Sequence, residues 1–263
     1  NERKSIPPST PQNIDRMHGA LLGPEYDQGS IDRVLQKEGA TYQTFTEEAE
    51  LLSHVASWLD QGLVVGWMQG RMEFGPRALG NRSILGDPRS STMQSLINRK
   101  IKYRESFRPF APSVLRDYVG EWFEHTADSP YMLLVSEVKK DKQIGMSESD
   151  KKLFGIEKLN IKRSTIPAIT HVDYSARIQT VHKETNPKYY NLINEFKKIT
   201  NCPVLVNTSF NVRGEPIVCS VEDAFNCFMG TNLDILVIED FLLFKKDQDK
   251  SLMKNYKNKF ELD

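Results

Sequence analysis

Hydrophobic residues recur at helix-like and strand-like spacings between residues 46 and 244, and the two kinds of spacing alternate along the chain. A helix is predicted from Thr46, a good N-cap residue followed by three glutamates, to the stop at Gly62. Further helices are expected at 91–100, just before 123, at 187–199 and at 221–229, and strands at 63–68, 110–115, 131–138, 166–171, 177–181, 203–207, 235–238 and 241–244. This alternation predicts an α/β domain.

Three segments depart from the pattern. Residues 1–45 are weakly patterned and contain Pro7, Pro8 and Pro11, so they are predicted to be a linker. Residues 139–163 are rich in Lys, Asp, Glu and Ser, which predicts a solvated loop or mobile insertion. Residues 70–86 form a glycine-rich stretch. The chain starts with Asn1 rather than Met, which suggests a processed form or a piece of a longer protein.

Composition limits the function classes. The chain has 263 residues with 35 Lys and Arg against 35 Asp and Glu, so its net charge is zero. This balance argues against a nucleic-acid coat or a membrane-surface binder, and the apolar runs are too short to span a membrane. Three cysteines without paired spacing, and the lack of an apolar leader, favour a reducing cytoplasm.

The zero net charge hides a basic segment. Residues 71–108 hold nine Lys and Arg residues against three acidic ones, a net charge of +6. Most of the nine are arginines, which bind phosphate through a bidentate fork, and glycines between them let the backbone approach a ligand. The spacing matches neither a Walker A loop nor GxGxxG. A phosphate site of another kind is one interpretation, and a solvated basic surface is the other.

Three further clusters carry polar groups. Lys102 and Arg104 would share one face of an extended strand and attract an anion, or else form a surface pair with Glu105. Residues 206–216 place Asn, Thr and Ser where a strand ends, which suits a ligand site of an open sheet but also an ordinary capped turn. His171 and Asp173 have no third metal ligand at a suitable spacing, so no metal site is expected.

The ordered motifs EFGPRALGNRSIL, IKYRESFRPFAPSVL, HVDYSARIQTV and VLVNTSFNVRGEPIV resemble the C-terminal domain of the O-carbamoyltransferases, which include nodulation-factor and antibiotic-tailoring enzymes. The resemblance covers residues 45–245. It implies that residues 46–263 form a YrdC-like domain of α/β (α+β) type, a twisted mixed sheet flanked by helices. It also implies that residues 1–45 are the tail of an absent upstream actin-like transfer domain.

The resemblance also implies a reaction. Similar domains make carbamoyl-adenylate from carbamoyl phosphate and ATP, with Mg²⁺ arriving on the nucleotide, and the upstream domain passes the carbamoyl group to a hydroxyl. Neither nucleic acid nor membrane is an expected partner. By position in the motifs, the catalytic residues would be Arg77, Lys102, Arg177 and Ser209. The nucleotide-binding residues would be Arg82, Arg104, Arg108, His171, Asn207 and Asn211. Tyr174 stands where the family usually has glycine, which affects the expected position of Arg177.

Three alternatives stay open at this point. A threonylcarbamoyl-adenylate synthase of the same fold would use threonine and bicarbonate, although the long GPRALG and RPFAP motifs argue against it. A non-catalytic RNA- or polyanion-binding module would need only the basic segment. A domain that is inert without its upstream partner is the third.

Overall fold

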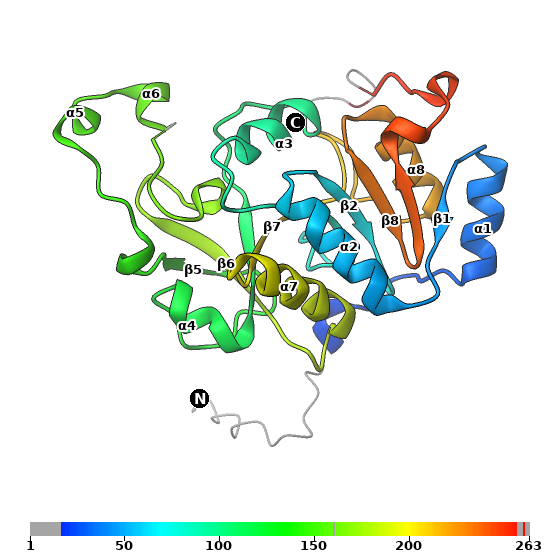
Figure 1. The fold of residues 1–263 in the computed structure, drawn as a ribbon, viewed down its shortest axis with the longest axis horizontal. Coiled ribbons are helices and arrows are strands. Elements are labelled where there is room, and N and C mark those ends of the chain that lie inside the picture. The colour runs from blue at the N-terminus through cyan, green and yellow to red at the C-terminus, as the bar shows by residue number, and fades with distance from the viewer. Residues whose placement is uncertain (1–16, 160, 257–259, 261–263) are drawn as a thin grey trace, which may run out of the picture.

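A mixed nine-stranded sheet organises the residues that the computed structural model describes, namely 17–159, 161–256 and 260 (Figure 1). The strands are β1 (Gln43–Thr44), β2 (Val65–Met68), β3 (Arg82–Gly86), β4 (Ala111–Leu115), β5 (Leu134–Glu137), β6 (Ser175–Val181), β7 (Val204–Ser209), β8 (Ile235–Ile238) and β9 (Phe241–Phe244). Their order is β1-β9-β8-β2-β3-β7-β4-β6-β5. The pairs β2–β8 and β4–β6 are parallel and the other pairs are antiparallel, which confirms the predicted mixed α/β class.

Helices pack on this sheet. The α-helices are α1 (Gln28–Lys37), α2 (Glu48–Asp60), α3 (Met93–Lys100), α4 (Val119–Trp122), α5 (Glu148–Lys151), α6 (Gly155–Leu159), α7 (Pro187–Thr200) and α8 (Val221–Gly230). Helices α2 and α7 lie against each other in front of the strands, and α1 packs on α8 (Figure 1). All four residues of β2 and of β8 are buried, so both faces of the central sheet are covered. The apolar core therefore surrounds the strands that carry the site.

Local sequence signals explain the long helices. Asn186 caps α7 by accepting the backbone N–H of Tyr189, Pro187 occupies its first turn, and Asn201 ends it with a φ of 57°. Ser220 and Asp223 form a capping box at the start of α8. Both helices then bury an apolar face in the core, which supplies most of their stability.

The structure corrects three expectations from the hydrophobic pattern. The segment 28–44 is not an unstructured linker, because it forms α1 and β1, and Ile31 and Leu35 of α1 are fully buried. The apolar run 166–171 is not a strand but a 3₁₀ turn at Pro167–Ile169. The glycine-rich stretch ends in β3, a buried strand that the pattern did not predict.

The predicted insertion has more local structure than expected. Residues 139–163 contain the short helices α5 and α6, and they extend away from the sheet on one side (Figure 1). The side chain of Phe154 is 92% exposed there. Within the described part of the chain, no helix combines the length and apolar character needed to cross a membrane.

Candidate functional site

Two adjoining cavities lie where β7 ends. The larger, which we call the Lys102 cavity, has a volume of about 420 Å³, and the smaller, the Arg177 cavity, about 160 Å³. Arg104 and Ser209 line both, so the cavities share a wall. Eight of the ten residues predicted from the motifs line one or both cavities: Arg77, Lys102, Arg104, Arg108, Arg177, Asn207, Ser209 and Asn211.

Lys102 is the buried centre of the larger cavity, with only 3% of the residue exposed. Its ammonium donates to the carbonyl oxygen of Ser209, to Ser209 Oγ at 3.2 Å and to Asn211 Oδ1 at 2.6 Å. Burial, and then the nearby Arg104, lower its pKa to about 7. Lys102 therefore holds the serine and asparagine in place and brings to the cavity a charge that binding of an anion would stabilise.

Lys102 and Arg104 were expected to share one face of an extended strand, but they do not lie on a strand. They follow the end of α3 in a turn where Tyr103 has a φ of 49°, and this turn brings both side chains to the same cavity. Asn98 of α3 fixes the turn, because its Oδ1 accepts Arg104 Nε at 2.7 Å and its amide donates to the Arg108 carbonyl at 2.8 Å. The proposed partner Glu105 pairs instead with Arg108 at 3.0 Å.

The loop that carries Arg77 is folded around a buried carboxylate. Glu73 is 4% exposed, and its Oε1 accepts the backbone N–H groups of Leu79 at 2.6 Å and Asn81 at 2.7 Å. Gly80 has a φ of 112° and lies against the ring of Tyr189. The carboxylate and the glycine together bend the chain so that Arg77 lies at the Arg177 cavity.

A matched pair of glycines in this loop gives a stability prediction. In Gly80→Ala the added Cβ would lie 2.2 Å from Tyr189 Cδ1, whereas at Gly75, with a φ of 139°, it would meet nothing within 4 Å. Both substitutions incur the backbone strain of a positive φ, about 1 kcal/mol or more, but only Gly80→Ala also displaces a buried ring. Urea unfolding should therefore show Gly80→Ala as the less stable variant by at least about 1 kcal/mol. Equal losses would contradict the role given to Gly80.

The Arg177 cavity brings two like charges together. Burial and then the neighbouring Arg77 lower the pKa of Arg177, and Arg177 Nε is buried without a hydrogen-bond partner among the described residues. Behind them Asn207 donates to Ser113 Oγ at 3.0 Å and to Gln179 Oε1 at 2.9 Å. Arg104 also lines this cavity, and three guanidinium groups there favour occupation by an anion, which would offset their repulsion.

The affinity of the Lys102 cavity for anions should depend on pH. With a pKa of about 7, Lys102 loses its positive charge as the pH rises through neutrality. Between about pH 6 and 9, wild-type affinity for tripolyphosphate should therefore fall relative to that of Lys102→Met, in which no group titrates at this position. Calorimetric titrations of both proteins across this range measure the difference. Parallel pH profiles would show that Lys102 does not contribute its charge to binding.

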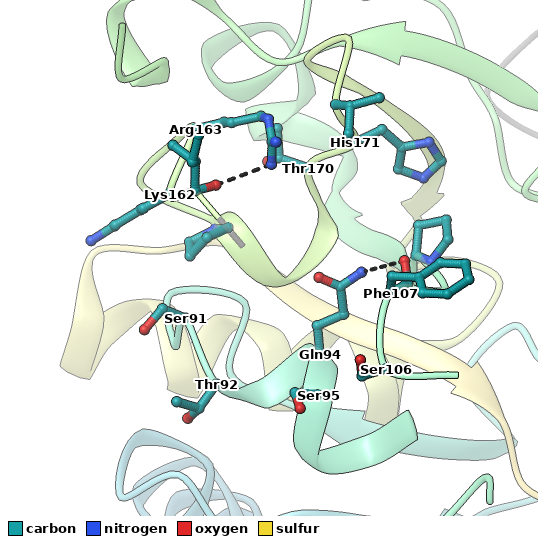
Figure 2. Close-up of a pocket in the computed structure, with 14 residues that line it drawn as sticks. Ser91, Thr92, Gln94, Ser95, Ser106, Phe107, Lys162, Arg163, Thr170 and His171 are labelled. Carbon is teal, nitrogen blue, oxygen red and sulfur yellow. Dashed lines mark hydrogen bonds between the residues drawn. The ribbon is translucent and has the colours of Figure 1, made fainter. Parts of the chain in front are cut away.

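Two predicted residues lie elsewhere. Arg82 is fully buried, and its guanidinium donates to carbonyl oxygens, including those of Gln69 at 2.9 Å and Asn81 at 2.8 Å. It lines neither cavity, and these bonds fix the loop, so its part in binding nucleotide stays a prediction. His171 lines a third cavity between α3 and residues 161–172 (Figure 2).

Other residues at the site were not predicted. Arg213 and Glu215 line the Lys102 cavity, and Glu215 Oε2 accepts the backbone N–H of Val212 at 2.8 Å while its Oε1 accepts the hydroxyl of Tyr256 at 2.9 Å. The signal for Arg213 was present, because a charged Arg-Gly-Glu run begins two residues after Asn211. Nothing in the sequence marks Asn98, Glu73 or Gln179 as a residue that positions the site, although Glu73 and Gln179 lie within the quoted motifs.

Tyr174 stands where the resemblance implied a glycine. It has a φ of 63°, a left-handed conformation that favours glycine, in the turn where its N–H donates to the His171 carbonyl at 3.0 Å. The chain thus keeps the turn in spite of the side chain, and Arg177 still lines its cavity.

Comparisons with known proteins identify relatives of this domain. The family model described as carbamoyltransferase C-terminus matches residues 56–245. An uncharacterized protein of Synechocystis sp. is 56% identical over 252 residues, which cover 95% of this chain and 41% of that protein. The nodulation protein NolO of Bradyrhizobium diazoefficiens is 41% identical over 239 residues, or 90% of this chain and 40% of NolO.

An enzyme named for its reaction is also similar. The 3'-hydroxymethylcephem-O-carbamoyltransferase of Streptomyces clavuligerus is 34% identical over 195 residues, which cover 73% of this chain and 33% of the enzyme. The chain thus spans between 33 and 41% of the length of these three relatives. The family match over most of the fold and the extent of these identities show that the chain belongs to the O-carbamoyltransferase family, as its C-terminal domain.

Proposed function

We propose that this domain forms carbamoyl-adenylate from carbamoyl phosphate and ATP, as one half of an O-carbamoyltransferase. The observation that supports this most strongly is the convergence of six cations on two adjoining cavities. These cations are Arg77, Lys102, Arg104, Arg108, Arg177 and Arg213. Both substrates are polyanions that must be held together, and five of the six cations are arginines, which stay charged at neutral pH and bind phosphate through a bidentate fork.

The proposed reaction needs charge stabilisation more than a nucleophile. Carbamoyl phosphate is hydrolysed to carbamate and phosphate, and a carbamate oxygen then attacks the α-phosphorus of ATP as the bond to pyrophosphate breaks. The attack joins two anions, so cations near phosphorus and near the departing pyrophosphate lower its barrier. Lys102, Arg104 and Arg108 would neutralise phosphate charge in the larger cavity, while Arg77 and Arg177 would do so in the smaller one.

The donor set of the cavities suits an anion better than a bare metal ion. Glu215 is the carboxylate that lines the Lys102 cavity, and it already accepts hydrogen bonds from Val212 and Tyr256. We therefore propose that Mg²⁺ enters on the phosphates of ATP, where it neutralises part of their charge. Ser209 and Asn211, held by Lys102, would orient the nucleotide or the carbamoyl end.

The reaction can be tested by isotope exchange. The chain should incorporate labelled pyrophosphate into ATP when carbamoyl phosphate is present, because adenylate formation is reversible at that step. Threonine with bicarbonate should support no exchange, and a threonylcarbamoyl-adenylate synthase would give the reverse pattern. A polyanion-binding module would give exchange with neither substrate set and would bind RNA with an affinity that falls steeply as salt is added.

A further inference from the structure

A third cavity, which we call the α3 cavity, lies beside the two cavities of the site. It has a volume of about 440 Å³, within the range of small-molecule sites, and it opens between α3 and residues 161–172 (Figure 2). Pro109 lines both this cavity and the Arg177 cavity, and Arg177 contributes to the lowered pKa of His171. A ligand whose anionic end lies at Arg177 can therefore extend past Pro109 into the α3 cavity.

The walls of the α3 cavity differ chemically from those of the site. Hydroxyl groups lie on α3 and the turns next to it, from Ser91, Thr92, Ser95 and Ser106, while Thr170 lies on the other side, where its hydroxyl donates to the Ile166 carbonyl at 2.8 Å (Figure 2). Gln94 of α3 lies near these hydroxyl groups and holds the segment that carries Phe107. Its amide donates to the carbonyl oxygens of Phe107 at 3.1 Å and Arg108 at 3.2 Å. This is a wall of short hydrogen-bonding groups on a rigid support, which suits a neutral ligand with several hydroxyls.

Flat apolar surfaces complete the cavity. Phe107 is 48% exposed although it is aromatic, and it lies near His171, with Pro109 and Pro167 also in the lining (Figure 2). Lys162 and Arg163 lie on the side opposite α3, and the cavity is lined by no Asp or Glu among the described residues. An exposed aromatic ring beside a cavity commonly marks a surface on which a planar ligand stacks.

We propose that the α3 cavity holds the nucleoside of ATP, with the base against Phe107 and the ribose at the serine and threonine hydroxyls. The inference rests on the proposed function, since it takes ATP to be the ligand whose phosphates occupy the cation-lined cavities. It assigns recognition of the nucleoside to residues 91–95, 106–109 and 161–172. The two cation-lined cavities then hold the phosphates and the carbamoyl group.

Two substitutions separate nucleoside recognition from phosphate recognition. Phe107→Ala removes the stacking surface, and Ser95→Trp fills the cavity from α3. Phe154→Ala is the matched control, because Phe154 is also an exposed phenylalanine but lines none of the three cavities. The affinities of the 263-residue chain and its variants for ATP and for tripolyphosphate are measured by calorimetry. Tripolyphosphate serves as the probe because it has the phosphates without the nucleoside.

Wild type should bind ATP more tightly than tripolyphosphate. Phe107→Ala and Ser95→Trp should each weaken ATP binding by about tenfold or more, the loss expected for one base–aromatic stack, and should change tripolyphosphate binding by less than about twofold. Phe154→Ala should change neither. Equal losses for both ligands, no loss for ATP, or a wild type that binds tripolyphosphate as tightly as ATP would each overturn the assignment.

Failure of the proposed function would look different. If ATP binding shows the predicted dependence on Phe107 and Ser95 but carbamoyl phosphate supports no pyrophosphate exchange, the adenylate reaction is wrong and the nucleoside site stands. If exchange occurs and both variants bind ATP as wild type does, the reaction stands and the nucleoside lies elsewhere. If wild type binds neither ATP nor tripolyphosphate, both proposals are wrong.

Discussion

Replacing Lys102 by methionine should lower carbamoyl-phosphate-dependent pyrophosphate exchange by at least about 100-fold, the loss typical of removing one preorganised donor from a charge-stabilising site. Methionine keeps an unbranched side chain, one atom shorter, and removes the ammonium. The variant loses the charge at the centre of the Lys102 cavity, and it loses the hydrogen bonds that hold Ser209 Oγ and Asn211 Oδ1. Exchange rates at saturating ATP and carbamoyl phosphate measure the effect.

The fold should survive this change. A buried ammonium is costly to desolvate, which is why burial lowers the pKa of Lys102, so its removal should not reduce the free energy of unfolding by more than about 2 kcal/mol. Lys100→Met is the matched control, because Lys100 lies two residues away, is exposed and lines neither cavity. It should retain wild-type exchange. Wild-type exchange in Lys102→Met, or an equal loss in both variants, would remove Lys102 from the site.

The second large effect is expected at the arginine pair. Arg77→Gln and Arg177→Gln should each weaken binding of carbamoyl phosphate by about tenfold or more, because a hydrogen bond to a charged group contributes about 1.5–3 kcal/mol. Neither variant should be less stable than wild type, since each substitution relieves repulsion between two partly buried guanidinium groups. Titration calorimetry and thermal unfolding of the free proteins test the two statements.

Arg71→Gln is the control for this pair. Arg71 belongs to the same basic segment, but its side chain is half exposed and its Nη2 lies 3.4 Å from Glu25 Oε1. It should leave binding of carbamoyl phosphate unchanged. If all three variants lost affinity to the same extent, the effect would come from the overall charge of the segment. The arginine pair would then have no special role.

Sequence reasoning predicted the elements whose hydrophobic pattern is simple. The strands at 235–238 and 241–244 have the predicted bounds because each is a short, continuous apolar run. It missed β3 because Arg82, Ser83 and Gly86 interrupt the apolar pattern, and only the pairing with β2 and β7 buries them. It predicted a strand at 166–171, where Pro167 starts a 3₁₀ turn instead.

The motifs located most of the candidate site but not the roles of individual residues. A motif cannot distinguish an arginine that lines a cavity, such as Arg77, from one whose guanidinium donates hydrogen bonds to backbone carbonyls, such as Arg82. Nor could it find the residues that position the others. Asn98 and Glu73 act through contacts that only the folded chain creates, to the turn after α3 and to the Arg77 loop.

Direct detection of the product tests the central claim. The chain is incubated with MgATP and isotopically labelled carbamoyl phosphate. The nucleotides are then separated and their masses are measured by mass spectrometry, with Lys102→Met as the negative control. The label should appear on AMP as carbamoyl-adenylate, with one pyrophosphate and one phosphate released for each molecule formed. Unlabelled AMP or ADP as the only nucleotide product, or a labelled adenylate formed equally by Lys102→Met, would contradict the claim.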